Sequence, residues 1–293
     1  MLYIYFDQFA ISGLSNAKKN EDWSKILNIL LQLKKQNKIC CCTSPETIFE
    51  TSQRNSIGID ENYKLISELL DNCFLNDIKQ IICQQIAKNI KEITSVQFLY
   101  PKYDFTSKEL NSHLKSMLYS TFENIYIPTL PIECTQTNIT KVTKILSENE
   151  IFKFIDSIKK FLSKEPSNSF YYIICKSLKD NFNFELEDFM KLQEDIYTNG
   201  FNMYPTLKIR STLYPFIFFS EYTKRQNIKL KNDLIDIRRI SSSLPYCDIV
   251  FCDSRWKEII KSLGINKKEK LETLLFSGSN TDLNDFYMYL LNL

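Results

Sequence analysis

Acidic residues in four separate segments are the side chains whose type and spacing could perform chemistry. Asp7 and Asp253 each follow a short apolar run, one near either end of the sequence. Glu50 follows a further apolar run, and Asp233 and Asp236 precede Asp253 on a stretch with helical spacing. Clustered carboxylates repel one another unless a cation neutralises them, and hard oxygen donors select Mg²⁺ or Mn²⁺. Such an ion acidifies bound water and stabilises a phosphate during displacement, so the predicted chemistry is phosphodiester hydrolysis.

Short apolar runs, some of which lead to these acids, predict buried strands. The runs from Leu2 to Phe6, Ile39 to Cys42 and Ile249 to Cys252 have the length and composition of such strands, and a last strand is expected from Leu271 to Phe276. Helical patterns lie between them, which predicts an α/β fold with a mostly parallel sheet. Sites in such sheets form outside the carboxyl ends of the strands, where we expect Asp7 and Asp253.

The helices that complete this unit can be placed from their caps and periodicity. Ser44 and Pro45 are typical of a helix start and put Glu50 in the next turn. Further helices are expected over Asp233 to Leu244, Trp256 to Leu263 and Leu283 to Leu291. The stretch between the two ends has long helical patterns and several prolines and is predicted to be all-α. We therefore expect three segments: a core in two parts, 1–59 and 221–293, and a helical insertion, 60–220.

Each acid also has a structural interpretation. Asp7 and Asp253 could serve as turn residues at strand ends, and Asp233 could be an N-cap with Asp236 near the positive end of its helix. Glu50 lies one helical turn after Glu46, and both would be ordinary on a solvated face. The joint pattern favours chemistry over these separate explanations.

That joint pattern resembles the PIN-domain family of nucleases. The matching pieces are YIYFDQF at 3–9, SPETIFET at 44–51 and NDLIDIRRISSSLPYCDIVFCD at 232–253. The resemblance implies a PIN-like three-layer α/β/α core with a mostly parallel sheet, interrupted here by a large all-α insertion. It implies that Asp7, Glu50, Asp236 and Asp253 are catalytic and that these four, with Asp233, bind Mg²⁺ or Mn²⁺. The spacing to Asp253 favours Asp236 over Asp233 as the closer ligand.

A PIN-like core implies a metal-dependent endoribonuclease, with RNA favoured over DNA as substrate. Family association suggests a toxin or a defence effector, and residues 60–220 would then bind a regulatory protein. Two alternatives remain open. The chain could be a nucleic-acid or protein binding module with a catalytically weak core, or a DNA nuclease of the flap-endonuclease type.

The overall charge requires that any nucleic acid be bound by a local patch. The formal net charge is only +2, from 37 basic and 35 acidic residues. A local phosphate-binding rim near the acids could be formed by Arg54, Lys224, Arg225, Lys229, Lys231, Arg238, Arg239, Arg255 and Lys257. A solvated surface of mixed charge is the alternative interpretation of the same residues.

Composition excludes other classes of chemistry. Only 5 glycines are present, with neither GxGxxG nor GxxxxGK[ST], which argues against nucleotide-driven catalysis. The single His113 argues against histidine-dependent RNA cleavage and against a Ser/His/Asp triad. The 9 cysteines contain no CxxC pair, so we expect reduced, mostly buried thiols rather than a zinc site. No basic leader or membrane-length apolar run is present, so we expect a soluble, cytoplasmic protein that does not contact a membrane.

Overall fold

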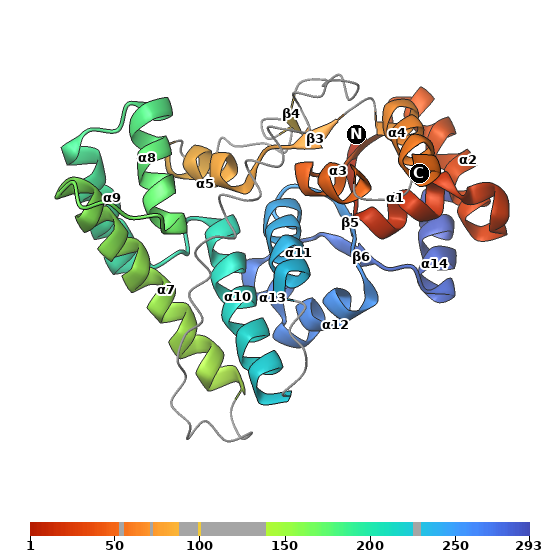
Figure 1. Ribbon diagram of the computed structural model, residues 1–293. Helices are drawn as coiled ribbons and strands as arrows, with labels where there is room; N and C mark the ends of the chain where they lie inside the picture. The colour runs from red at the N-terminus through yellow and green to blue at the C-terminus, as the bar shows by residue number, and fades with distance from the viewer. Residues whose placement is uncertain (53–55, 71–72, 88–98, 101–138, 225–229) are drawn as a thin grey trace. The chain divides into compact units, whose positions relative to one another are not determined.

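The computed structural model describes the chain except for residues 53–55, 71–72, 88–98, 101–138 and 225–229 (Figure 1). The described residues form two compact units. The sheet unit contains Met1–Asp77, the short strand β4 (Leu99–Tyr100) and Ser242–Leu293, so it joins the two ends of the chain. The helical unit contains described residues between Ile78 and Ser241.

A four-stranded, all-parallel sheet is the centre of the sheet unit and confirms the predicted α/β class. Its strands are β1 (Leu2–Phe6), β2 (Ile39–Cys42), β5 (Ile249–Phe251) and β6 (Leu274–Phe276), in the order β2-β1-β5-β6. The first three agree with the predicted strands to within a residue, whereas β6 begins three residues later than predicted. The sheet order places the first and the late strands side by side, with Phe6 opposite Phe251.

Alternation along the strands gives the sheet one strongly apolar face. Ile4, Phe6, Ile249 and Phe251 are fully buried on it, as expected for parallel strands. The ring of Phe251 lies 5.3 Å from that of Phe6 and 4.7 Å from that of Phe286. The apolar cluster on this face includes residues of α1 (Gln8–Ser15), α2 (Glu21–Lys35), α4 (Ser56–Leu70) and α14 (Asn280–Leu291) (Figure 1).

The remaining elements of the sheet unit connect the strands. The 3-10 turn η1 (Ala17–Lys19) joins α1 to α2, and α3 (Pro45–Ser52) follows β2 at the predicted Pro45 start. Helices α12 (Ser254–Leu263) and α13 (Ile265–Glu269) lead from β5 to β6. A second, antiparallel pair of strands, β3 (Phe74–Leu75) and β4, interrupts the region predicted to be all-α. Two-residue strands leave no periodic signal in the sequence.

The units divide the chain differently from the predicted segments. Most of helix α4 falls within 60–220, yet Ile66 and Leu69 are fully buried in the core of the sheet unit. Conversely α11 (Leu230–Ser243) was assigned to the core, but it groups with the helical unit as far as Ser241. Helical periodicity identifies a buried face without identifying what covers it, so the sequence could not assign either helix.

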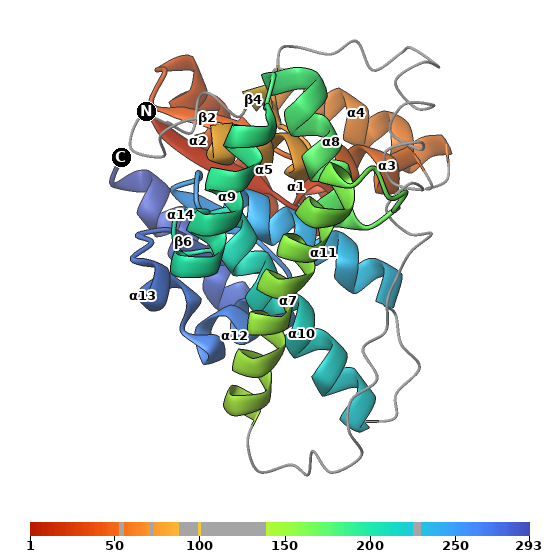
Figure 2. The same ribbon diagram turned by 90° about the vertical axis from the view of Figure 1, so that its left-hand side faces the viewer.

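The helical unit is built around aromatic packing. Its other helices are α5 (Ile78–Ala87), α7 (Ile139–Leu162), α8 (Phe170–Phe182), α9 (Leu186–Asn199) and α10 (Pro205–Lys224), and α7 lies alongside α10 (Figure 2). The ring of Phe154 stacks 4.8 Å from Tyr171, and Phe161 lies 5.1 Å from Phe189. None of the helices in the described ranges is long and apolar enough to cross a membrane.

A buried ion pair lies among these rings. Glu150 is 3% exposed and accepts hydrogen bonds from Lys153 Nζ at 2.6 Å and from Tyr171 Oη at 2.7 Å. Arg210 Nη1 lies 3.4 Å from the same carboxylate, and its guanidinium stacks 4.1 Å from the ring centre of Phe170. Burial raises the pKa of Glu150, but Arg210 and Lys153 outweigh it and the pKa is lowered. This carboxylate is fully engaged in holding α7, α8 and α10 together.

Candidate active site at the carboxyl ends of the strands

The order of the strands defines where a site can form in the sheet unit. From β1 the chain crosses to β2 on one side, while β5 and β6 lie on the other side. A parallel sheet opens a crevice at such a reversal, outside the carboxyl ends of the two central strands. Asp7 comes directly after β1, and Asp253 comes two residues after β5. The predicted placement of these two acids at one edge of the sheet therefore agrees with the structure.

Asp7 is buried at 9% exposure and is the N-cap of α1. Its Oδ1 accepts a hydrogen bond of 2.6 Å from the backbone N–H of Gln8. Asp253 is exposed and is the N-cap of α12, where its Oδ1 accepts from the N–H groups of Arg255 at 2.8 Å and Trp256 at 3.4 Å. Both acids thus have a structural role beyond ending a strand, because each satisfies N–H groups that a helix start leaves unpaired.

Buried hydroxyl groups fasten α3 to this edge. Thr43 Oγ1 donates to the carbonyl of Phe6 at 2.7 Å, next to Asp7. Tyr5 Oη donates to Ser44 Oγ at 3.1 Å, and Thr51 Oγ1 donates to Gln8 Oε1 at 2.8 Å. These bonds join the ends of β1 and β2 and hold the last turn of α3 against the start of α1. Glu50, the residue before Thr51, belongs to that turn.

The two glutamates of α3 differ in burial. Glu50 is half-buried, whereas Glu46 is buried at 4% exposure. The alternative that both lie on a solvated face is therefore wrong for Glu46, because the first turn of α3 packs into the unit. Sequence reasoning did not select Glu46 as a site residue. Its position one residue after the Ser-Pro start, where the helix dipole favours an acid, was the available signal.

Sequence reasoning also did not select Asp282, which follows β6 at the same edge of the sheet. Asp282, in the first turn of α14, accepts hydrogen bonds through Oδ2 from Ser277 N at 2.7 Å and Ser277 Oγ at 2.6 Å. Lys257 Nζ donates to its Oδ1. Burial raises the pKa of Asp282, but the bonds from Lys257 and Ser277 outweigh it, and the pKa is lowered. The Ser279-x-x-Asp282 pattern before an apolar helix is a capping signature and could have drawn attention to it.

The remaining predicted acids belong to the helical unit. Asp233 is 3% exposed and lies within the first turn of α11, which begins at Leu230, so its interpretation as an N-cap is wrong. Asp236 Oδ1 lies 3.4 Å from Arg239 Nη1, one turn along the same helix. The structure therefore divides the predicted site residues between units: Asp7, Glu50 and Asp253 in the sheet unit, and Asp233 and Asp236 in the helical unit.

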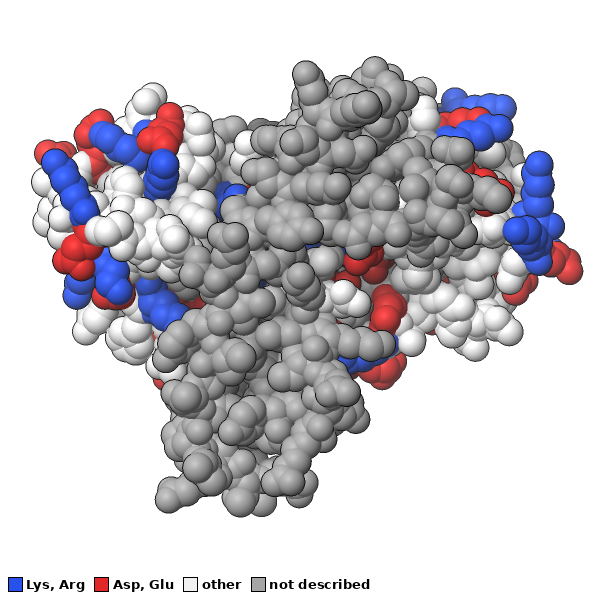
Figure 3. All heavy atoms as spheres, viewed as in Figure 1, with Lys and Arg blue, Asp and Glu red and all other residues white. Residues whose placement is uncertain are grey.

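The described residues of the predicted basic rim differ in burial and in partners. Arg238 and Arg239 are buried at 6% and 3% exposure, and Lys257 is bonded to Asp282. Arg255 is exposed, with its guanidinium 5.7 Å from the ring centre of Trp256. Arg54, Arg225 and Lys229 lie outside the described residues. On the face in Figure 3, the coloured Lys and Arg side chains are interspersed with Asp and Glu.

The described cysteines support the prediction of reduced thiols. They form no disulfide, and six of the eight are buried, while Cys134 lies outside the described residues, as does His113. Cys42 Sγ lies 3.9 Å from Cys247 Sγ. The hydrogen bond with Cys247 and burial both raise the pKa of Cys42 well above its ordinary value. A thiol held protonated in this way is a poor nucleophile and a poor metal ligand.

The acids at the sheet edge provide the chemistry for a hard cation, but not a closed set of ligands. Among the described residues, no three His, Cys, Asp or Glu side chains are grouped so that they could hold a metal ion. The carboxylates of Asp7 and Asp253 are donors of the type that Mg²⁺ and Mn²⁺ prefer. Comparison of the chain with protein-family models, curated proteins and solved structures finds no match.

Proposed function

We propose that the sheet unit is a PIN-like, metal-dependent nuclease that hydrolyses phosphodiester bonds, with RNA as the favoured substrate. The observation that carries the proposal is the position of two aspartates at a reversal of strand order. Asp7 and Asp253 follow the two adjacent central strands of a parallel sheet, at the edge where such sheets bind ligands. The preference for RNA rests on the resemblance of the acid-bearing motifs to PIN domains.

Asp7, Asp253 and Glu50 are the proposed ligands of Mg²⁺ or Mn²⁺ in this unit. The bound ion would supply an acidified water and neutralise the charge on the phosphate. Hydrogen bonds from backbone N–H groups at the starts of α1 and α12 hold the carboxylates of Asp7 and Asp253 in place. The sequence also predicts Asp233 and Asp236 as ligands, with Asp236 favoured.

A catalytic role and a capping role can be separated by the choice of substitution. Asparagine caps a helix about as well as aspartate but carries no charge, whereas alanine removes both functions. We therefore propose to measure cleavage of end-labelled single-stranded RNA and DNA by Asp7→Asn, Asp253→Asn and Glu50→Gln. The assays contain Mn²⁺ or Mg²⁺, with EDTA as the control for metal dependence.

The matched control is Asp248→Asn. Asp248 is exposed and lies just before β5, at the opposite end of the strand from Asp253, where it accepts a hydrogen bond of 2.6 Å from Tyr3 N. We expect metal-dependent cleavage of RNA that falls by at least about a hundredfold, a change in activation free energy of about 2.7 kcal/mol, in the three site variants. We expect Asp248→Asn to cut at the wild-type rate. Cleavage that persists in Asp7→Asn and Asp253→Asn contradicts the proposal.

A second candidate function is a binding module with a catalytically weak core. The observation that favours it is the use of both strand-end aspartates as helix caps, which explains their presence without catalysis. This candidate predicts binding of single-stranded RNA or DNA without metal-dependent cutting. A DNA nuclease of the flap-endonuclease type predicts instead that the same three site variants lose cleavage of DNA.

A further inference from the structure

The three adjacent cysteines of β2 lie on two faces of the sheet. Cys41 belongs to the apolar cluster of the sheet unit. Cys40 and Cys42 alternate with it along the strand and therefore point to the other face. Cys40 Sγ lies 3.9 Å from Cys73 Sγ. Cys42 Sγ lies at the same distance, 3.9 Å, from Cys247 Sγ. Two pairs of thiols with equal separation thus lie along one strand.

Backbone hydrogen bonds hold Cys73 beside β2. The N–H of Cys73 donates to the carbonyl of Leu70, the last residue of α4, at 2.8 Å. Its carbonyl accepts a hydrogen bond of 3.3 Å from the N–H of Thr43, directly after β2. The carbonyl of Thr43 in turn accepts from the N–H of Leu75 at 2.8 Å. Cys73 is therefore tied both to the end of α4 and to the end of β2, and the backbone brings its sulfur to Cys40.

The two thiol pairs differ in their exposure to solvent. Cys42 and Cys247 are buried at 0% and 4% exposure. Cys40 and Cys73 are partly exposed, and among the described cysteines they are the two that are not buried. A disulfide bond is about 2.05 Å long, so the sulfurs of either pair have to approach by about 2 Å to form one. The distance does not distinguish the pairs, whereas access for a reagent in solution does.

We propose that Cys40 and Cys73 are a reversible disulfide site that is oxidised by small-molecule disulfides such as oxidised glutathione. The hydrogen bond with Cys40 and burial both raise the pKa of Cys73, so Cys73 keeps its proton and Cys40 attacks first. The thiolate of Cys40 breaks the S–S bond of the reagent, forms a mixed disulfide and releases one glutathione. The sulfur of Cys73 then attacks Cys40 Sγ and releases the second glutathione. The two glutathione thiolates take up the two protons that the protein thiols lose, so one disulfide is exchanged for another.

The new bond would close a ring that contains α3 and α4 (Figure 1). A cross-link restricts the unfolded chain more than the folded chain. The oxidised protein should therefore unfold at higher denaturant, when unfolding is followed by the fluorescence of Trp23 and Trp256 in the sheet unit. Disulfide formation does not depend on the proposed nuclease activity, so the peptide map and the cleavage assay can fail independently.

The test incubates the full chain with oxidised glutathione in native buffer, blocks the remaining thiols with N-ethylmaleimide and maps the peptides by mass spectrometry. We expect a peptide in which Cys40 is linked to Cys73. Without blocking, the intact mass should fall by about 2 Da, and dithiothreitol should restore it. Cys42 and Cys247 are the matched control in the same sample. They should cross-link at least about tenfold more slowly, because a buried strand has to open before the reagent reaches them.

Single variants separate the thiol that attacks first from the thiol that completes the bond. Cys73→Ser should stop at the mixed disulfide, with glutathione on Cys40. Cys247→Ala should link Cys40 to Cys73 at the wild-type rate. Circular dichroism checks that both variants fold, and the wild-type peptide map needs no variant. A native chain that does not link Cys40 to Cys73 overturns the proposal. Linking of Cys42 to Cys247 at an equal rate also overturns it.

Discussion

The two units hold carboxylates in different surroundings. In the helical unit Glu150 lies among aromatic rings, and Lys153, Tyr171 and Arg210 all bond to it. In the sheet unit Asp7 and Asp253 follow strands, and each accepts a hydrogen bond from a backbone N–H group at the start of a helix. A buried acid saturated by neighbours is part of the architecture. Acids that follow neighbouring strands at one edge of a parallel sheet are the better candidates for chemistry.

The two units can be followed separately in solution because both tryptophans, Trp23 and Trp256, lie in the sheet unit. Tryptophan fluorescence therefore reports on the sheet unit alone. Far-ultraviolet circular dichroism reports on the helices of both units. Denaturation followed by both signals therefore shows which of the two units a substitution destabilises.

The largest expected effect is that of Glu150→Ala. Removing the buried partner Glu150 leaves the largely buried Arg210 charged and unneutralised, which costs about 3 to 5 kcal/mol of unfolding free energy. We expect the circular dichroism transition to move to lower denaturant, while the fluorescence transition stays in place. Glu150→Ala combined with Arg210→Met should cost less than Glu150→Ala alone, because no unpaired charge remains. A double variant as unstable as the sum of the two single variants would contradict this account.

Gly13→Ala should instead destabilise the sheet unit. A methyl group at Gly13 of α1 would overlap the indole of Trp23, with Cζ2 only 2.7 Å away. In an open helix alanine is favoured over glycine by about 1 kcal/mol, but overpacking here should reverse the sign and cost about 1 to 3 kcal/mol. The fluorescence transition should move. Gly264→Ala is the control for backbone strain alone, since Gly264 has φ +62° and nothing within 4 Å of the added methyl group.

Acid should weaken both units. The pKa of Glu150 is lowered from its ordinary 4.5, and that of Asp282 from 3.8. The stability that each ionised carboxylate contributes is present above those ordinary values and is lost as the pH falls through the lower folded-state pKa. Melting temperatures between neutral pH and pH 3 should therefore depend less on pH in Glu150→Gln and in Asp282→Asn. An unchanged pH dependence in both variants would refute this assignment.

The smallest expected effect on stability concerns the helix-capping role of Asp253, which two substitutions separate from its charge. Asp253→Ala should cost about 1 kcal/mol of unfolding free energy, because the N–H groups of Arg255 and Trp256 lose their acceptor. Asp253→Asn should cost close to nothing. Chemical denaturation followed by fluorescence measures both. If Asp253→Asn is as unstable as Asp253→Ala, its use as a charge-only probe in the cleavage assay fails.

The sequence by itself determined the local features of the sheet unit. The apolar runs Leu2–Phe6 and Ile39–Cys42 are strands, and α3 begins at Pro45, as predicted. Apolar runs, caps and prolines influence the backbone over only a few residues, so they can be interpreted without knowledge of the rest of the chain. The placement of Asp7 and Asp253 at one edge also followed, because parallel strands end on the same side.

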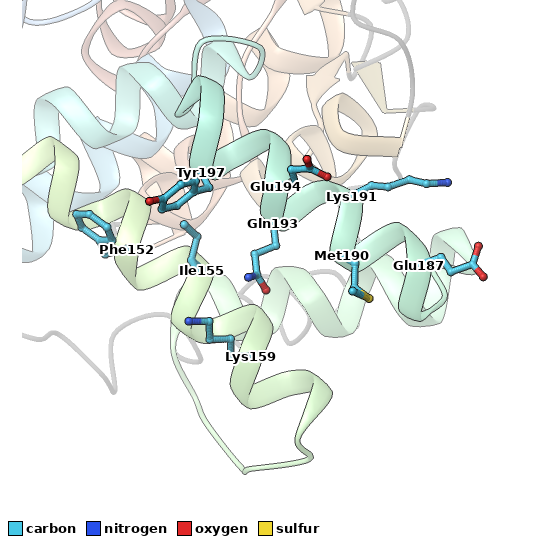
Figure 4. A pocket seen from close by; sticks show the side chains of 9 residues that line it. All are labelled: Phe152, Ile155, Lys159, Glu187, Met190, Lys191, Gln193, Glu194 and Tyr197. Atoms are coloured by element: carbon cyan, nitrogen blue, oxygen red, sulfur yellow. The ribbon is translucent and has the colours of Figure 1, made fainter.

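Only the tertiary structure decided which segments belong together. It packed α4 into the sheet unit, placed Asp233 and Asp236 in the helical unit and buried Glu46. It also brought Lys257 to Asp282 and left Met190 and Tyr197 of α9 exposed (Figure 4). A hydrophobic period identifies a face that will be covered, but the partner is chosen by long-range packing, which no local pattern encodes.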